Sequence, residues 1–162
     1  MSSERQWLRE ALQEIMLPKL TQLGFAVLPL SGEDAKSREV RAAFPFGRFR
    51  REGRQGFEQI EIQLHTPPRA QFRLNVGVVP RDGVRNKLGS FEVDQVWVSY
   101  LPEHAECPSL HRWFSVRRWP WQRETADDYR QLVTRVAEMT VDIELFFKEQ
   151  KSRNLRRVRV SW

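Results

Sequence analysis

Hydrophobic residues recur at three- and four-residue spacings at the start of the chain, between Glu4 and Leu23. This periodicity predicts an amphipathic helix with one apolar stripe. Pro18 lacks a backbone donor and crowds the carbonyl of Glu14, so we expect a kink or an early end there. Gly24 is expected to stop the helix. The stripe consists of Leu8, Ala11, Leu12, Ile15, Met16, Leu20 and Leu23.

From Glu39 to Trp119 the apolar positions alternate with polar or small ones, which is typical of strands. Because each predicted strand has one apolar and one mixed face, we expect an antiparallel sheet that is covered on one side. Turns are expected at residues 66–69 and 81–83. The pattern therefore predicts five or six strands in meander order. The runs lie at residues 40–44, 60–64, 72–78, 93–101 and 110–119.

Helical spacing returns after Thr125, which can form a capping-box-like start with Asp128. The predicted fold class is α+β, with an antiparallel meander sheet and the N-terminal and C-terminal helices packed on one face. The second apolar stripe consists of Tyr129, Leu132, Val133, Val136, Met139, Ile143, Phe146 and Phe147.

The chain has 162 residues, of which 40% are hydrophobic, so we expect a single domain over residues 1–150. Residues 151–162 are predicted to be a basic C-terminal tail that forms either an edge strand or a mobile arm. Cys107 is the single cysteine, which excludes an intrachain disulfide and fits a reducing compartment. The opening residues lack the pattern of a secretion signal and no apolar run would span a membrane. We therefore expect a cytoplasmic protein without membrane association.

The net charge is +6, and its 27 basic residues are 22 Arg and 5 Lys. Residues 38–54 carry a local excess of +4, from six arginines against two glutamates, and residues 151–162 carry five basic groups and no acidic one. Such an excess is common on a solvated surface and also on a surface that binds nucleic acid. The nucleic-acid hypothesis assigns binding to Arg48, Arg50, Arg51, Arg54, Arg112, Arg117 and Arg118.

Phosphate-binding loops, dinucleotide fingerprints and nucleophile elbows are absent from the sequence. We therefore expect no cofactor, no catalytic residues and no enzymatic activity. One metal hypothesis remains open, because His104, Cys107 and His111 bring imidazole and thiol ligands within eight residues. Their spacing matches no common zinc motif, so a plain connection between strands is the favoured interpretation.

Two groups of residues suggest a surface for a protein partner. Residues 111–121 interleave aromatic rings with arginines, which is typical of protein-binding hot spots and also of single-stranded nucleic-acid binding. The mixed faces of the central strands are expected to stand side by side, away from the main helices, where they form either the wet side of the sheet or a groove. The candidate residues are Glu61, Gln63, Arg73, Asn75, Arg112, Trp113, Arg117, Arg118, Trp119 and Trp121.

Three segments resemble domain-of-unknown-function family 4304, a group of small, mostly bacterial proteins without an established biochemical role. They are Leu20-Thr21-Gln22-Leu23-Gly24-Phe25, Ile60-Glu61-Ile62-Gln63 and Phe72-Arg73-Leu74-Asn75-Val76-Gly77-Val78. The resemblance extends in order over most of the chain and implies an α+β domain, but it transfers no catalytic residue. The leading hypothesis is a non-enzymatic interaction domain that binds a protein partner through the Arg/Trp surface and the exposed sheet face. Nucleic-acid binding and a metal-dependent activity are the alternatives.

Overall fold

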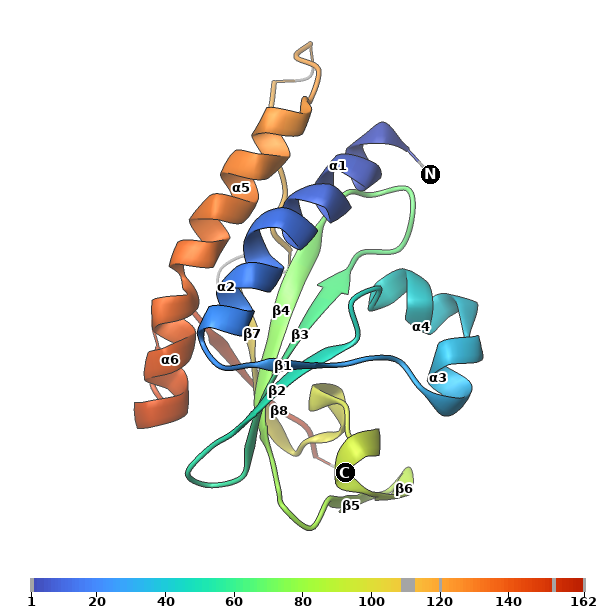
Figure 1. The fold of residues 1–162 in the computed structure, drawn as a ribbon, viewed down its shortest axis with the longest axis vertical. Helices are drawn as coiled ribbons and strands as arrows, with labels where there is room; N and C mark the ends of the chain where they lie inside the picture. Colours follow the sequence, from blue (N-terminus) through green and yellow to red (C-terminus); the bar gives the residue numbers. More distant parts are fainter. Residues whose placement is uncertain (1, 109–112, 120, 153, 162) are drawn as a thin grey trace.

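The computed structural model describes residues 2–108, 113–119, 121–152 and 154–161 and has an α+β fold (Figure 1). A six-stranded antiparallel sheet has the order β1-β2-β3-β4-β7-β8, which confirms the predicted meander. Its strands are β1 (Ala26–Leu28), β2 (Arg48–Glu52), β3 (Phe57–Leu64), β4 (Phe72–Val79), β7 (Glu103–Cys107) and β8 (Arg156–Arg159). The chain between β4 and β7 forms a separate hairpin, which consists of β5 (Val84–Asn86) and β6 (Gly89–Phe91).

The N-terminal helix continues from α1 (Ser3–Ala11) through a π-helical segment (Leu12–Met16) into α2 (Leu17–Gln22). Pro18 lies just after the π-helical segment, whose wider turn relieves the contact between the proline ring and the preceding turn. Of the two outcomes expected at Pro18, the early end is wrong, because the helix continues to Gln22, and the distortion takes the form of a π bulge. Gly24 follows the last turn with φ of 88°, a left-handed conformation that favours glycine.

The C-terminal helical region consists of α5 (Ala126–Glu138) and α6 (Thr140–Glu149). The predicted capping box is present, because the backbone N–H of Thr125 donates to the carboxylate of Asp128 at 2.8 Å. Met139 separates the two helices. Both lie on the same face of the sheet as the N-terminal helix, and α1 and α5 run side by side (Figure 1). The predicted packing of both helical regions on one face is confirmed.

The main core lies between this helical layer and the sheet. Strand residues that face the helices alternate with polar ones, as the sequence pattern predicts. Burial of these side chains supplies the main driving force for docking the helices on the sheet. The fully buried strand residues include Phe49, Ile60, Ile62, Leu74 and Val76.

Part of the opposite face is covered by residues 93–101, which we call the cap segment. Two short 3-10 turns, η2 (Val93–Gln95) and η3 (Val98–Tyr100), fold this segment back onto the sheet. Its apolar side chains form a second core cluster with those of the β4 end and the β5–β6 hairpin. The buried members of this cluster are Val79, Val84, Val96, Val98 and Leu101.

Gly77 on β4 lets the cap segment approach the sheet closely. A Cβ atom at this position would lie 2.5 Å from Cδ1 of Leu101 and 3.3 Å from Cγ1 of Val98. Both side chains are buried, so neither has free space into which it can move. The close approach therefore depends on the absence of a side chain at this position.

The structure corrects two predicted strands. Residues 93–101 form the 3-10 turns of the cap segment, and residues 40–44 lie largely in the helix α4 (Arg38–Ala43), which follows α3 (Gly32–Lys36). Ser37 starts α4 by accepting a hydrogen bond from the backbone N–H of Val40 at 3.3 Å. Alternation over so few residues fits a short capped helix as well as a strand.

Two further predictions concern the later part of the chain. Within the predicted strand 110–119, residues 109–112 lie outside the described residues, and Phe114 forms an isolated antiparallel bridge with Phe72. The segment predicted as a basic tail supplies β8, which pairs with β7 and forms an edge of the sheet. The edge-strand interpretation is therefore correct for Arg156–Arg159, and this segment belongs to the domain. Among the described residues, no helix is long and apolar enough to cross a membrane.

Candidate functional site

The polar side chains of β3 and β4 gather on the face opposite the main helices. Glu61 is the cross-strand partner of Asn75, and Gln63 is the partner of Arg73. The side-chain oxygen of Gln63 accepts hydrogen bonds from Nε of Arg73 at 2.8 Å and from Nδ2 of Asn75 at 3.1 Å. The structure thus brings together the four sheet residues that the sequence pattern places side by side.

Glu106 on β7 extends this polar row. The sequence pattern did not lead us to place it there. Its carboxylate forms an ion pair with Arg73 at 3.0 Å and a second one with Arg156 of β8. Arg73 also lies over the ring of Trp113, 4.8 Å from the ring centroid, and this ring contacts His65. A charge-assisted network therefore joins β4, β7 and β8. The signal available in the sequence was the alternation of β7, which places Glu106 on the same face as Asn75.

Glu61 lies in the most enclosed part of this face and has no exposed surface. One carboxylate oxygen accepts hydrogen bonds from the backbone N–H of Val98 at 2.6 Å and from Nε2 of Gln59 at 2.8 Å. Burial raises the pKa of Glu61 to about 7, although both hydrogen bonds and the nearby charge of Arg48 lower it. Glu61 therefore anchors the cap segment to the sheet and is sealed from solvent.

The expected exposed sheet face is only partly exposed. The cap segment buries Glu61 completely and leaves Asn75 only 4% exposed, whereas Gln63 and Arg73 keep partial exposure. Both interpretations of this row, as the wet side of the sheet or as a polar groove, are therefore wrong for Glu61 and Asn75. The reason is the cap segment, whose strand-like pattern gave no sign that it folds over this face.

Four of the seven arginines proposed for nucleic-acid binding lie within residues 48–54, and two of these four are buried. Arg48 is 2% exposed, donates to the carbonyl of Val96 at 3.2 Å and lies over the ring of Trp97. Arg50 is 7% exposed and forms two hydrogen bonds with Oε1 of Gln59, at 2.9 and 2.7 Å. Both guanidiniums attach the cap segment to the sheet, because each donates to a backbone carbonyl of that segment. Neither presents its charge to a nucleic acid, so this part of the hypothesis is wrong.

The other two arginines differ from each other. Arg51 lies on the helical face between Glu58 and Glu144, with ion pairs of 2.6 and 2.9 Å, and its guanidinium stacks on Phe25. Its charge is thus compensated inside the fold. Arg54 is exposed in the turn between β2 and β3. The four arginines therefore do not form one cationic surface.

The metal hypothesis fails for two of its three residues. His104 and Cys107 are separated by three positions on β7 and point to opposite faces of the sheet. His104 is buried near the cap segment, where desolvation lowers its pKa, and Cys107 lies in the main core, where burial raises its pKa to about 12. One ion cannot bind both side chains. The third candidate, His111, lies outside the described residues.

Among the described residues, the most exposed aromatic side chains lie in the loop before α5. We call residues 117–123 the Arg/Trp loop. Trp119 and Trp121 are 65% and 76% exposed, and their rings stack with centroids 5.3 Å apart and an interplanar angle of 10°. Arg118 in the same loop forms an ion pair with Asp128 at the start of α5. Arg112, also predicted as a contact residue, lies outside the described residues.

An apolar pocket of about 480 Å³ lies beside the Arg/Trp loop. Trp113 and Phe114 line one side, and Leu132, Val136 and Met139 of the helical region line the other. The described lining includes Arg117 and Arg135 and no acidic residue. This pocket suits a ligand that places an apolar side chain inside it and a carboxylate at its arginines.

The Arg/Trp loop and the other arginine-rich segment do not converge. The loop projects at one end of the long axis of the molecule, above α5, whereas the β2–β3 turn with Arg54 lies at the other end (Figure 1). A single ligand cannot use both unless it extends along the whole sheet.

The fold and the polar network define an antiparallel α+β domain with one helical face and one capped face. No known family model matches the chain, and neither a curated protein nor a solved structure matches it. The resemblance to family 4304 therefore stays a prediction.

Proposed function

We propose that this protein is a non-enzymatic interaction domain that binds a protein partner through the Arg/Trp loop and the adjoining apolar pocket. The stacked and exposed pair of Trp119 and Trp121 carries the proposal. Large aromatic side chains are costly to leave in water and are enriched, with arginine, among residues that dominate binding energy. The pocket beside the loop offers the concave surface that such a contact needs.

The state of Glu61 supports a binding role over a catalytic one. A carboxyl group with a pKa of about 7 would suit general acid or base chemistry. However, Glu61 has no exposed surface, and its hydrogen bonds hold the cap segment in place. Its raised pKa is therefore explained by its structural position.

The test compares proteins that co-purify with tagged variants from the native source. Trp119→Ala/Trp121→Ala removes the stacked pair, and Leu88→Ala truncates a side chain of similar exposure, 63%, in the turn of the β5–β6 hairpin. We expect a stoichiometric partner with the wild type and with Leu88→Ala that is lost with the tryptophan double variant. Loss of each of these hot-spot side chains should weaken the binding free energy by at least about 2 kcal/mol. Equal recovery with both variants would refute the proposal.

Single-stranded nucleic acid is the competing ligand for the same rings, because bases stack on exposed indoles. A titration with mixed-sequence oligonucleotides at low salt, followed by tryptophan fluorescence, separates the two. We expect no saturable change. Saturable binding that weakens steeply with salt and disappears in Trp119→Ala/Trp121→Ala would replace the protein partner with nucleic acid.

A further inference from the structure

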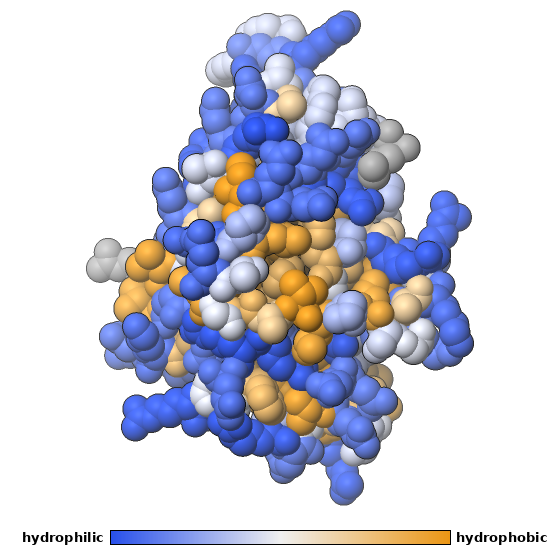
Figure 2. All heavy atoms as spheres, in the orientation of Figure 1, coloured by the Kyte–Doolittle hydropathy of each residue, from blue (hydrophilic) through white to orange (hydrophobic). Residues whose placement is uncertain are grey.

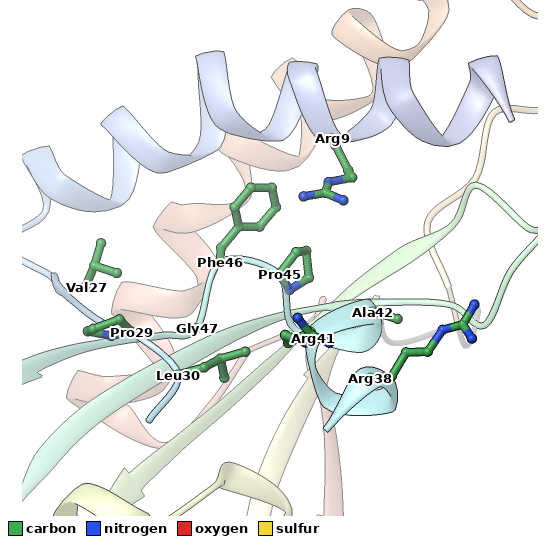
Figure 3. Close-up of a pocket in the computed structure, with 10 residues that line it drawn as sticks. All are labelled: Arg9, Val27, Pro29, Leu30, Arg38, Arg41, Ala42, Pro45, Phe46 and Gly47. Carbon is green, nitrogen blue, oxygen red and sulfur yellow. The ribbon is translucent and has the colours of Figure 1, made fainter. Parts of the chain in front are cut away.

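A second surface, separate from the Arg/Trp loop, lies along the edge of the sheet. A groove of about 490 Å³ runs beside β1, between α1 and α4 (Figure 3). Val27, Leu30 and Phe46 supply apolar surface at its β1 end, and Pro45 continues this surface toward α4. Figure 2 shows the same feature from outside, as an apolar area over the middle of this face with hydrophilic residues around it.

The other end of the groove is cationic. Arg9 extends from α1 toward Phe46 and Pro45, Arg41 lies beside Pro45, and Arg38 extends from α4 at the far end (Figure 3). The described lining contains no acidic residue. Within the described parts of the chain, the guanidinium of Arg41 makes no hydrogen bond and no ion pair. The groove is therefore polarised, with apolar side chains at one end and arginines at the other.

A buried arginine behind the groove wall adds to this positive charge. Arg5 is only 5% exposed and donates to the carbonyls of His65 at 2.6 Å, Arg69 at 3.2 Å and Ala42 at 2.9 Å. Among the described residues, no carboxylate lies within 4.0 Å of its guanidinium. Burial and the nearby charge of Arg9 lower its pKa. Since Ala42 also lines the groove, the uncompensated positive charge of Arg5 lies next to the groove.

The strand that borders the groove has a free edge. β1 is the first strand in the sheet order, so it pairs with β2 on one side and with no described strand on the other. Val27 at its centre is 48% exposed. An unpaired edge of this kind is a template for the backbone of another extended chain, unless the protein blocks it.

We propose that this groove binds an extended acidic segment of a partner protein, which pairs with the free edge of β1. Its apolar side chains would contact Val27 and Phe46, and its carboxylates would lie at the end formed by Arg38 and Arg41. Charge complementarity selects an acidic ligand, and the open shape with a free strand edge selects a peptide segment over an enclosed small molecule. This site is independent of the proposed function, because it shares no residue with the Arg/Trp loop or its pocket.

The test measures fluorescence anisotropy with labelled peptides of about six residues, the usual length of a strand. The probe has a run of glutamates joined to Val-Thr-Val, in either order. One control replaces the glutamates with lysines, and another carries N-methyl groups on alternate Val-Thr-Val amides, which prevents strand pairing. We expect saturable binding of the acidic probe in at least one order and no binding of either control.

Protein variants locate the site. Arg38→Glu/Arg41→Glu reverses two charges in the groove, and Arg85→Glu/Lys87→Glu makes the same change in net charge on the β5–β6 hairpin. The groove variant is expected to weaken binding at least about tenfold, and the hairpin variant less than about twofold. Circular dichroism and unfolding midpoints check that both variants fold, and the two control peptides test the proposal without any variant.

Three outcomes would overturn the proposal. Equal weakening by both charge reversals would show that the net charge alone attracts the peptide. Undiminished binding of the N-methylated peptide would exclude pairing with β1. Displacement of the peptide by glutarate or decanoate at equal concentration would show a site for a small anion. None of these outcomes depends on the Arg/Trp loop, so they also leave the proposed function separately testable.

Discussion

Replacing Glu61 with glutamine tests the role assigned to the capped face. Glu61 is fully buried under the cap segment. One oxygen of its carboxylate, Oε2, has no hydrogen-bond partner and no contact with solvent. Glutamine keeps the shape of the side chain and an oxygen that accepts from Val98 and Gln59. It removes the negative charge. We therefore expect Glu61→Gln to fold and to change the pH dependence of stability.

The size of this pH-dependent change in stability follows from the pKa of Glu61, which burial raises from 4.5 to about 7. Below pH 4.5 the carboxyl is protonated in both the folded and the unfolded chain, and the full stability is present. Between pH 4.5 and 7 the unfolded chain releases a proton that the folded protein keeps, so the free energy of unfolding falls as the pH rises. The loss is complete above the folded pKa and amounts to about 3 kcal/mol. Glutamine suffers no such loss.

The assay is urea unfolding of the wild type and of Glu61→Gln from pH 4 to pH 8.5, followed by tryptophan fluorescence. The free energy of unfolding of the variant minus that of the wild type should rise by about 3 kcal/mol between pH 4.5 and pH 8. Glu149→Gln, at an exposed position of α6, is the matched control and should give a nearly constant difference. A constant difference for Glu61→Gln would refute the claim that this carboxyl is buried as the structure shows.

Two further substitutions and one reactivity measurement test other parts of the fold. Gly77→Ala places a Cβ atom 2.5 Å from a leucine carbon of the cap segment, so it should lower the free energy of unfolding by about 1 to 3 kcal/mol in urea. Arg51→Met leaves the carboxylates of Glu58 and Glu144 without their shared partner and should cost about 2 kcal/mol or more, again measured in urea; no loss would contradict the role of this ion pair. The thiol of Cys107, whose pKa is about 12, should react with a disulfide reagent at pH 8 only after the protein is unfolded.

The main layers of the fold could be predicted from the sequence, because their patterns are long. The helix from Ser3 to Gln22 and the strands β3 and β4 each present enough turns or alternations to identify the buried face. The capping box of Thr125 and Asp128 also fixed the start of α5, since its two residues lie close in sequence.

Shorter segments could not be predicted, because distant contacts decide their conformation. The cap segment has apolar positions that fit a strand, but the carboxylate of Glu61 binds the backbone of Val98, 37 residues away. Arg48 and Arg50 carried no sign of burial, since their partners in the cap segment lie more than 40 residues further along the chain. A polar residue on the mixed face of a strand is buried only if another segment covers it.

The candidate sites follow the same rule. The Arg/Trp loop is continuous in sequence, so its residue types alone are enough to predict it as a binding surface. The groove beside β1 collects residues from α1, β1, α4 and the turn before β2, so no local pattern reveals it. Arg38 and Arg41 were visible only as part of an arginine-rich segment. The structure separates these two residues from Arg48 and Arg50, which are buried.

This separation explains why the net charge of +6 is a poor guide to binding. Arg51 and Arg73 face carboxylates of neighbouring elements, so they contribute little to the field outside the protein. Arg5 is different, because its described partners are carbonyl oxygens and its charge adds to those of Arg38 and Arg41 around the groove. A general excess of charge would attract polyanions to every arginine-rich segment. A local uncompensated charge beside a free strand edge instead requires an acidic ligand that is also extended, which distinguishes this groove from the rest of the basic surface.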